Sequence, residues 1–278
     1  MVHFDETETA WCNAGVSRPA SLHIHFRTLR DRPVPPPWRH EFRFVAEYVA
    51  AEVVASRRYR FLVANSIEVG KSLRRLNRQA TVTVAPFSLE PSHYPPAPVD
   101  GPPCAGIIGA GYWPPTATSI DRLVRRVWPK VHRAVPAARL LIAGRDTARL
   151  SRVSPAPPGV EYLGEVDAAA AFLSQLSLLL YPATRGSGVK VKVLEAMACA
   201  VPVVTTPSGA EGVAANAGII ICDSDEELAA TAVRLLQDVH ERRERGAEGR
   251  AVFLRDHSPG PATVPLVELF RHMAESAA

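Results

Sequence analysis

This chain has few cysteines, and their spacing fits neither a metal site nor a disulfide framework. There are four in 278 residues, scattered and without the short intervals that metal ligands show. They are Cys12, Cys104, Cys199 and Cys222. We therefore expect each to be a small buried or half-buried thiol in a reducing compartment.

Long apolar runs and blocks of one charge are also missing. No run approaches the roughly 20 apolar residues that a membrane-spanning helix needs. Asp5, Glu6 and Glu8 stand where a secretory signal peptide would be basic and then apolar, so we predict a soluble cytoplasmic protein. The net charge of +4 suits an anionic ligand and leaves a peripheral membrane contact open. No Lys/Arg-rich tail is present, so we expect no nucleic-acid partner.

The composition is that of an ordinary globular protein, with 47% hydrophobic and 22% charged residues. The length allows one large domain or two modest ones. The 25 prolines cluster between apolar runs, which indicates frequent loops. The densest group lies at 86–103, and we predict an inter-domain linker there.

From about residue 100, short apolar runs alternate with longer amphipathic segments. The apolar runs predict strands at 105–109, 139–143, 160–163, 176–180, 201–205 and 218–222. The amphipathic segments predict helices at 119–134, 167–175, 188–199, 225–240 and 241–256. Ser224 and Glu227 fit a capping box at one helix start. Strict alternation of this kind indicates an α/β fold, with a parallel sheet and helices on both faces.

Residues 1–99 follow the same plan less completely. Strands are predicted at 22–26, 60–64 and 81–84, and a helix at 41–57. We expect a partial Rossmann-like domain at 1–99, ending in the Pro-rich linker, and a second Rossmann-like domain at 100–256. A C-terminal helix within 257–278 is expected to pack back on the N-terminal part.

The segment from Tyr181 to Val204 carries the most chemistry. It reads as a buried strand, a loop with Gly186 and Gly188, a helix and another buried strand. Glycines allow close backbone approach, and a helix N-terminus favours an anion such as a diphosphate. Lys190 and Lys192 add positive charge there, and Glu195 follows on one side of the helix, where a carboxylate can bind ribose hydroxyls. On these grounds alone, an ordinary amphipathic helix with a surface Lys192–Glu195 pair accounts for the pattern equally well.

A family resemblance favours the ligand site. The pattern Gly186-Ser-Gly-x-x-x-Lys192-Val-Leu-Glu-Ala-Met-Ala-x-x-x-Pro-Val-Val204, followed by Pro207-x-Gly-Ala-Glu-Gly212, resembles the donor-site signature of family 4 (group 1) glycosyltransferases. The resemblance covers about residues 104–272. It implies two Rossmann-like domains that face a cleft, the GT-B type, with the nucleotide-sugar held mostly by the C-terminal one. The N-terminal domain is expected to lack roughly its first 80 to 100 residues, which leaves a homo-oligomer through the incomplete domain open.

The resemblance also implies roles for individual residues. Glu195 matches the carboxylate that binds the nucleotide ribose, and Lys192 the basic residue that binds the diphosphate. His25 matches a histidine near the donor sugar and is the candidate catalytic residue, with His23 as a rival. The remaining candidates for the donor site are Gly186, Ser187, Gly188, Lys190, Gly209, Glu211 and Gly212.

Two departures from the family pattern matter. The first glutamate of the family's Glu-x7-Glu motif would fall at Ser187. The loop 109–115 lacks the Arg and Lys that many members carry after the first strand of the donor domain, so Lys190 and Lys192 are left to neutralise the diphosphate.

The predicted function is transfer of a sugar from a nucleotide diphosphate sugar to an unknown acceptor, which could be a glycan, a lipid or a small molecule. The resemblance implies retention of anomeric configuration, and neither a metal nor a cofactor is expected. Two alternatives stay open. The chain could be a truncated, non-catalytic nucleotide-binding relative, or a nucleotide-sugar epimerase on the same architecture.

Overall fold

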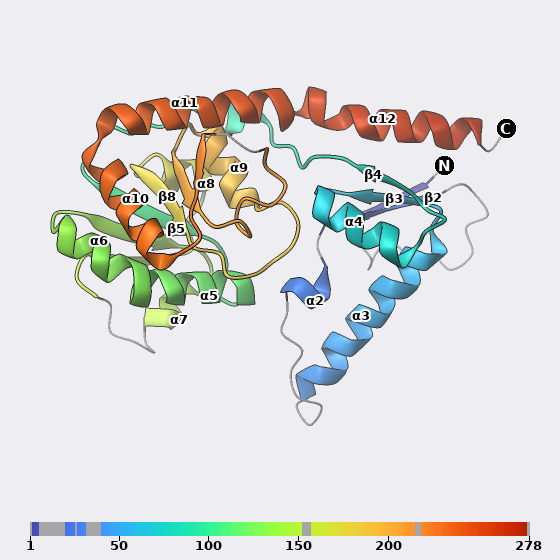
Figure 1. Ribbon diagram of the computed structural model, residues 1–278, viewed down its shortest axis with the longest axis horizontal. Coiled ribbons are helices and arrows are strands. Elements are labelled where there is room, and N and C mark those ends of the chain that lie inside the picture. The colour runs from blue at the N-terminus through green and yellow to red at the C-terminus, as the bar shows by residue number, and fades with distance from the viewer. Residues whose placement is uncertain are drawn as a thin grey trace. The chain divides into compact units, whose positions relative to one another are not determined.

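The computed structural model describes residues 2–5, 20–25, 27–31, 40–151, 157–214 and 218–276. Cys12 and Phe26, for which the sequence makes predictions, lie outside them. The chain forms two compact units, and each is built from separate stretches (Figure 1). The first unit comprises 1–88, 186–189 and 259–278, and the second comprises 89–185 and 190–258.

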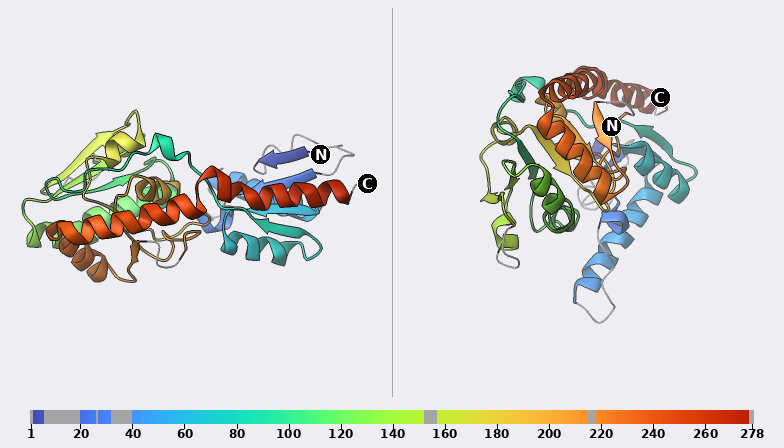
Figure 2. Two further views of the ribbon diagram at one scale, coloured as in Figure 1. Left: turned by 90° about the horizontal axis from the view of Figure 1, so that it is seen from above. Right: turned by 60° about the vertical axis from the view of Figure 1, so that its left-hand side comes forward.

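The first unit is built on a four-stranded parallel sheet in the order β1-β2-β3-β4. Its strands are β1 (Val2–Asp5), β2 (Ala20–Ile24), β3 (Phe61–Ala64) and β4 (Thr81–Val84). Its helices are α2 (Thr28–Asp31), α3 (His40–Arg58), α4 (Ile67–Leu76) and α12 (Pro259–Glu275). Figure 2 shows β1 at one edge of the sheet, and α12 running along the sheet.

Side chains alternate between the two faces of this sheet, and each face has its own core. Leu22 and Leu62 are fully buried on one face, in a cluster with Ala55 of α3 and Leu73 of α4. The other face is packed against α12, and its cluster consists of Phe61, Val63, Ala85, Leu269 and Met273. The C-terminal helix is therefore part of the core of the first unit.

Asn65 and Ser66 connect β3 to α4. Ser66 is the N-cap of α4, and its side chain accepts a hydrogen bond from the backbone N–H of Val69 at 3.1 Å. A serine hydroxyl in this position satisfies one of the amide groups that the first helical turn leaves without an intrahelical acceptor.

The second unit is built on a six-stranded sheet in the order β10-β9-β8-β5-β6-β7, with every neighbouring pair parallel. Its strands are β5 (Cys104–Ile108), β6 (Arg139–Ala143), β7 (Val160–Gly164), β8 (Leu178–Tyr181), β9 (Val203–Thr205) and β10 (Ile219–Ile221). Its helices are α5 (Pro114–Arg122), α6 (Trp128–Ala134), α7 (Thr147–Ser151), α8 (Ala169–Leu173), α9 (Val191–Ala198), α10 (Asp225–Gln237) and α11 (Val239–Asp256). A short 3-10 turn covers Pro91–His93.

Helices cover both faces of this sheet, and in Figure 1 β5 and β8 lie between α11 and the pair α5 and α6. The predicted α/β class, with two parallel sheets, is confirmed. The buried cysteine residues Cys104, Cys199 and Cys222 are free thiols, as predicted.

Two helices differ from their predicted bounds. The helix predicted at 119–134 starts earlier, at Pro114, and a π-helical turn over Leu123–Val127 separates α5 from α6. The helix predicted from residue 188 begins only at Val191, because Gly188 has a left-handed φ of 71° that a right-handed helix cannot include. Lys190 is consequently the N-cap residue, and only Lys192 lies in the first turn.

The predicted capping box at the start of α10 is present. Ser224 Oγ accepts from the N–H of Glu227 at 3.1 Å. Glu227 reaches back to the N–H of Asp223 at 2.8 Å, one residue before the N-cap, where a capping box usually uses the N-cap residue itself.

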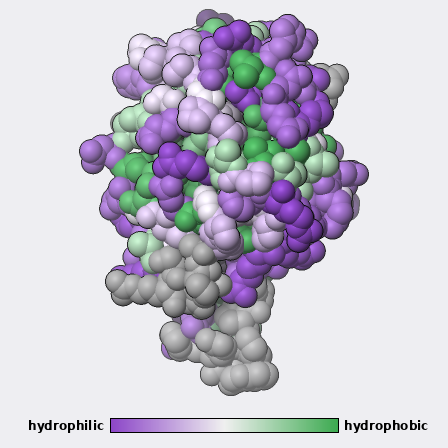
Figure 3. Space-filling model, turned by 90° about the vertical axis from the view of Figure 1, so that its left-hand side faces the viewer, coloured by the Kyte–Doolittle hydropathy of each residue, from purple (hydrophilic) through white to green (hydrophobic). Residues whose placement is uncertain are grey.

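Among the described residues, none of the helices combines the length and the apolar character that crossing a bilayer requires. Hydrophilic residues predominate on the face shown in Figure 3, and apolar residues lie among them.

Candidate functional site

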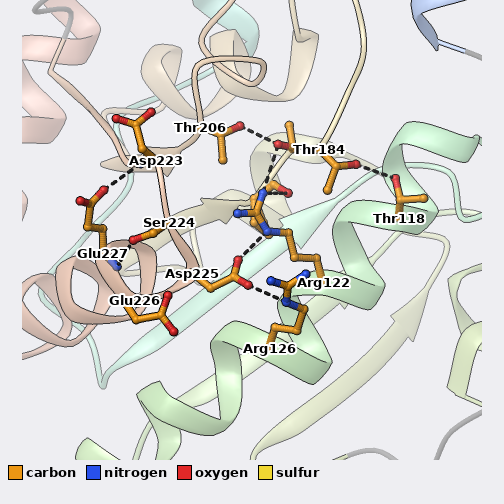
Figure 4. Close-up of polar contacts among 12 residues, drawn as sticks. Thr118, Arg122, Arg126, Thr184, Thr206, Asp223, Ser224, Asp225, Glu226 and Glu227 are labelled. Carbon is orange, nitrogen blue, oxygen red and sulfur yellow. Dashed lines mark hydrogen bonds and ion pairs between the residues drawn. The ribbon is translucent and has the colours of Figure 1, made fainter.

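In the second unit, the loops that follow β5, β8 and β9 start at one edge of the sheet, because parallel strands end on the same side. The loop after β8 leads to the predicted glycine motif, and side chains anchor its start (Figure 4). Arg122 Nη1 lies 3.4 Å from the carbonyl oxygens of both Pro182 and Ala183. The Thr206 hydroxyl, after β9, donates to the carbonyl of Ala183 at 2.7 Å.

Arg122 is itself held by a buried carboxylate. Its Nε lies 2.6 Å from Asp225 Oδ1, and Arg126 Nε lies 2.6 Å from the other oxygen of that carboxylate (Figure 4). Asp225 is the first residue of α10, where a negative charge also interacts favourably with the helix dipole. The ion pairs of Asp225 with Arg122 and Arg126 are called the Asp225 clamp below. Through Arg122, this clamp links α5, α10 and the loop after β8.

Lys192 lies beside the loop that follows β5. Its Nζ is 3.3 Å from Thr116 Oγ1 and 4.6 Å from the centre of the Tyr181 ring. A Cβ on Gly109 would approach that Nζ to 3.0 Å, so the lysine occupies the space that a side chain at Gly109 would need. No ion pair joins Lys192 to a carboxylate among the described residues.

The surroundings of Lys192 disfavour its charged form. Burial, followed by the positive charge of Lys190, lowers the pKa of Lys192 to about 8, and the carboxylate of Glu195 opposes this shift only in part. A half-buried ammonium group whose charge is this poorly compensated is stabilised by any anion that comes into contact with it.

Glu195, on the same helix, is bonded by a residue that sequence reasoning missed. Tyr94 Oη donates to Glu195 Oε1 at 3.1 Å. Burial is the main cause that raises the pKa of Glu195, and burial together with the Glu195 charge raises the pKa of Tyr94 to about 12. Oε2 of Glu195 makes no hydrogen bond to the described part of the chain.

The segment that carries Tyr94 is fastened to α9 and α11. The Tyr94 carbonyl accepts from Arg250 Nη1 at 2.9 Å, and the Ala97 N–H donates to the Cys199 carbonyl at 2.7 Å. The sequence held one signal for this role, a single tyrosine among prolines. A buried tyrosine hydroxyl usually has a hydrogen-bond partner, so Tyr94 could have been expected to bond another side chain. The partner itself, 101 positions away, could not be read from the sequence.

The second predicted loop forms a tight turn. The N–H groups of Gly209 and Ala210 both donate to the Thr206 carbonyl, at 2.9 and 3.0 Å, so these two amides close the turn. Gly212 has a left-handed φ of 84°, and Glu211 is half-buried beside it.

The glycine motif itself, residues 186–189, belongs to the first unit. The Ser187 N–H donates to Asp31 Oδ1 at 2.5 Å, and Ser187 Oγ lies 3.0 Å from the same oxygen. A buried carboxylate therefore contacts the position at which the family motif has its first glutamate. A Cβ on Gly188 would come within 2.1 Å of the His25 carbonyl oxygen, so the chain passes too close there for any other residue.

His25 and its rival His23 lie on one face of the first sheet, with ring centres 4.1 Å apart. His25 Nε2 is 2.6 Å from Asp5 Oδ1, and His23 Nδ1 is 3.7 Å from the same oxygen. With Nε2 bonded to the carboxylate, Nδ1 of His25 is the basic nitrogen. Within the described ranges, that buried nitrogen has no hydrogen-bond partner.

Known proteins resemble mainly the second unit in sequence. A family model described as "Glycosyl transferases group 1" matches residues 103–238. A curated relative, the GDP-mannose-dependent monoacylated alpha-(1-6)-phosphatidylinositol monomannoside mannosyltransferase of Corynebacterium glutamicum, is 34% identical over 145 residues. The match covers 47% of this chain and only 38% of that relative.

Solved structures share the fold. Sucrose-phosphate synthase from Thermosynechococcus elongatus matches with a TM-score of 0.74 at 17% identity, covering 99% of this chain and 74% of that one. TarM of S. aureus, in complex with UDP, gives 0.70 at 15% identity, over 94% and 52%. Anabaena HepE, in complex with UDP and glucose, gives 0.69 at 14% identity, over 99% and 77%. These solved structures show that the chain has a GT-B-like fold, and its residues 103–238 match the group 1 glycosyltransferase family.

Proposed function

We propose that this chain binds a nucleoside diphosphate sugar through its second unit and takes part in transferring the sugar to an acceptor hydroxyl. The observation that carries the proposal is Lys192, a half-buried cation in the first turn of α9, without a carboxylate in ion-pair contact among the described residues. Glu195 follows three positions later on the same helix. This order, a cation at the helix start and then a carboxylate, suits a diphosphate joined to a ribose.

The diphosphate is assigned to Lys192, with Lys190 as a second source of charge at the N-cap. The loop 109–115 lacks cations of its own, but the side chain of Lys192 extends to Gly109 in that loop. A single lysine can thus supply positive charge next to this loop. Negative charge develops on the leaving diphosphate during transfer, and a fixed cation in a partly desolvated position stabilises that charge strongly.

The ribose is assigned to Glu195. Tyr94 bonds Oε1 and fixes the orientation of the carboxylate, which leaves Oε2 to accept hydrogen bonds from ribose hydroxyls. Gly209, Glu211 and Gly212 remain candidates for contact with the phosphates or the sugar. Because the turn uses the amides of Gly209 and Ala210, contact from this loop would come from its other polar groups.

In the first unit, His25 remains the candidate catalytic residue, and Gly186, Ser187 and Gly188 belong to the proposed donor loop. Asp5 fixes the tautomer in which His25 Nδ1 can accept a hydrogen bond from a sugar hydroxyl. The contact of Ser187 with Asp31 supplies an acidic group beside the serine that replaces the family's glutamate. Retention of configuration and a transfer step without metal complete the proposal, on the strength of the family resemblance.

The nucleotide base is left to experiment, because the similar proteins differ. The Corynebacterium relative is named for GDP-mannose, whereas TarM and HepE are described in complex with UDP. Calorimetry with UDP, GDP and ADP therefore comes first. We expect one of the diphosphates to bind with a clear preference over its nucleoside, because the diphosphate carries the charge that Lys192 recognises.

The ribose assignment is tested with the preferred diphosphate and its 2′,3′-dideoxy form. We expect the wild-type protein to favour the ribose form by about 1–3 kcal/mol, the range for hydrogen bonds to a charged group. Glu195→Gln should lose most of that preference, and Glu226→Gln, at an exposed glutamate on α10, should keep it. An unchanged preference in Glu195→Gln would refute the ribose assignment.

Product analysis separates the transferase from its two alternatives. Transfer releases the nucleoside diphosphate and forms a new glycoside. An epimerase would leave an altered sugar, and a non-catalytic relative would bind the nucleotide and form no product.

A further inference from the structure

Three histidines and an aspartate gather on one face of the first sheet. One ligand atom from each of His3, Asp5 and His23 lies within 4.8 Å of those of the other two. His25 adjoins them, with its Nε2 2.6 Å from Asp5 Oδ1. None of these contacts depends on the second unit.

The strand pairing places these side chains together. β1 and β2 are parallel, with His3 opposite Ser21 and Asp5 opposite His23. Because residues two apart share a face, all four side chains project from the same side. The strand that follows, β3, places Phe61 and Val63 on this side as well, since they pair with Ser21 and His23.

Helix α12 covers that face only in part. Its Leu269 and Met273 pack on Phe61 and Val63 of β3. Toward β1, the Phe270 ring stands 5.5 Å from the His3 ring, centre to centre. His3 and Asp5 remain exposed beyond it, and His23 is half-buried, so the cluster has an apolar wall on one side and solvent on the other.

A neighbouring side chain orients one of the three ligands of this cluster. His3 Nδ1 is 2.8 Å from the hydroxyl of the buried Ser21, a contact of the kind that orients histidine ligands from behind.

We propose that His3, Asp5 and His23 form a binding site for a divalent first-row transition metal of the zinc class. Two imidazoles and a carboxylate are a ligand set that suits zinc, nickel or cobalt, and not magnesium. Ligand atoms around tetrahedral zinc stand about 3.3 Å apart at the usual bond lengths. Binding an ion therefore requires the exposed side chains of His3 and Asp5 to rotate toward it, from separations of up to 4.8 Å.

This site is distinct from the proposed transfer chemistry, which needs no metal. It adjoins that chemistry through Asp5, whose carboxylate also bonds His25. His25 Nε2 faces Asp5, so the bound ion and His25 share one carboxylate. Metal binding can be measured without a donor, an acceptor or turnover.

The test uses the full, untagged chain, freed of metal with a chelator and titrated with Zn²⁺ by calorimetry. We expect one equivalent to bind, and Mg²⁺ not to bind. His3→Ala, Asp5→Asn and His23→Gln should each weaken zinc binding by at least about tenfold, and melting curves identify any variant that fails to fold. Asp5→Asn, at an exposed position with nearly the same shape, is the decisive variant if His23→Gln unfolds.

Two controls separate this cluster from other donors. His240→Ala, on the exposed side of α11, and Cys12→Ala should leave zinc binding unchanged. With Co²⁺ in place of zinc, the visible spectrum should show nitrogen and oxygen ligation without a thiolate charge-transfer band. Absence of stoichiometric zinc binding, equal affinity for Mg²⁺, or full zinc affinity in folded Asp5→Asn would each overturn the proposal.

Discussion

The low pKa of Lys192 predicts that the proposed nucleotide binding depends on pH, in a range where few other groups titrate. Burial and the charge of Lys190 lower this pKa to about 8. The lysine is then about nine-tenths charged at pH 7 and about one-tenth charged at pH 9. A diphosphate binds the charged form, so its affinity should fall as pH rises through about 8. Between pH 7 and pH 9 the expected loss is about tenfold, or about 1.4 kcal/mol.

The same linkage predicts that the protein takes up a proton when it binds a nucleoside diphosphate. The bound anion raises the pKa of Lys192, so about half a proton should be taken up at pH 8. Calorimetry in two buffers that differ in ionisation enthalpy measures this number directly. Salt should weaken the affinity for the diphosphate, because the attraction is electrostatic.

Lys192→Arg is the matched variant, because arginine stays charged throughout this pH range. It should bind the diphosphate with an affinity that hardly changes from pH 7 to pH 9, and without proton uptake. Lys192→Ala should lose more affinity for the diphosphate than for the nucleoside. If Lys192→Arg keeps the pH dependence of the wild type, another group titrates and the assignment of the diphosphate to Lys192 is wrong.

Two further predictions concern residues that support the site. Tyr94→Phe removes the hydrogen bond to Glu195 and should weaken nucleotide binding by about 1 kcal/mol. Tyr112→Phe, at an exposed tyrosine, should leave the affinity unchanged. If calorimetry gives equal nucleotide affinities for Tyr94→Phe and the wild type, Tyr94 does not position Glu195. Asp225→Ala leaves two arginine partners without their carboxylate and should lower the free energy of unfolding in urea by about 3 kcal/mol. Glu226→Ala, at the exposed neighbouring position, should have a much smaller effect. If the two variants unfold at similar urea concentrations, the ion pairs of Asp225 do not stabilise the fold.

Local pattern was sufficient to predict most of the second unit. The strand at 139–143 was predicted with the bounds of β6, because a short continuous apolar run between amphipathic segments is typical of a buried parallel strand. Lys192 and Glu195 were placed on one helix for an equally local reason, their spacing of three residues. The start of α9 was predicted wrongly because it depends on backbone conformation. Gly188 has a left-handed φ, so the helix begins at Val191 and not at residue 188.

Contacts between distant residues could not be predicted. Strand β1 has only four residues and no continuous apolar run, and its pairing with β2 gives it a place at the sheet edge. Tyr94 and Thr116 reach α9 across 101 and 76 positions of chain, and neither stands in a motif. The Asp31–Ser187 contact joins residues 156 positions apart. The presence of helix α9 was thus predictable from sequence, and the residues that surround its side chains were not.

The late position of α12 in the chain has a consequence for synthesis on the ribosome. Phe61, Val63 and Ala85 are made early, but Leu269 and Met273, which bury them, follow only after the whole second unit. At about 5–20 residues per second, that interval lasts on the order of 10–40 s. Throughout it, a newly made sheet presents an apolar face to solvent, where a chaperone that recognises exposed hydrophobic surface would have time to bind. The nascent first unit therefore reaches its final form only after the second unit has been synthesised.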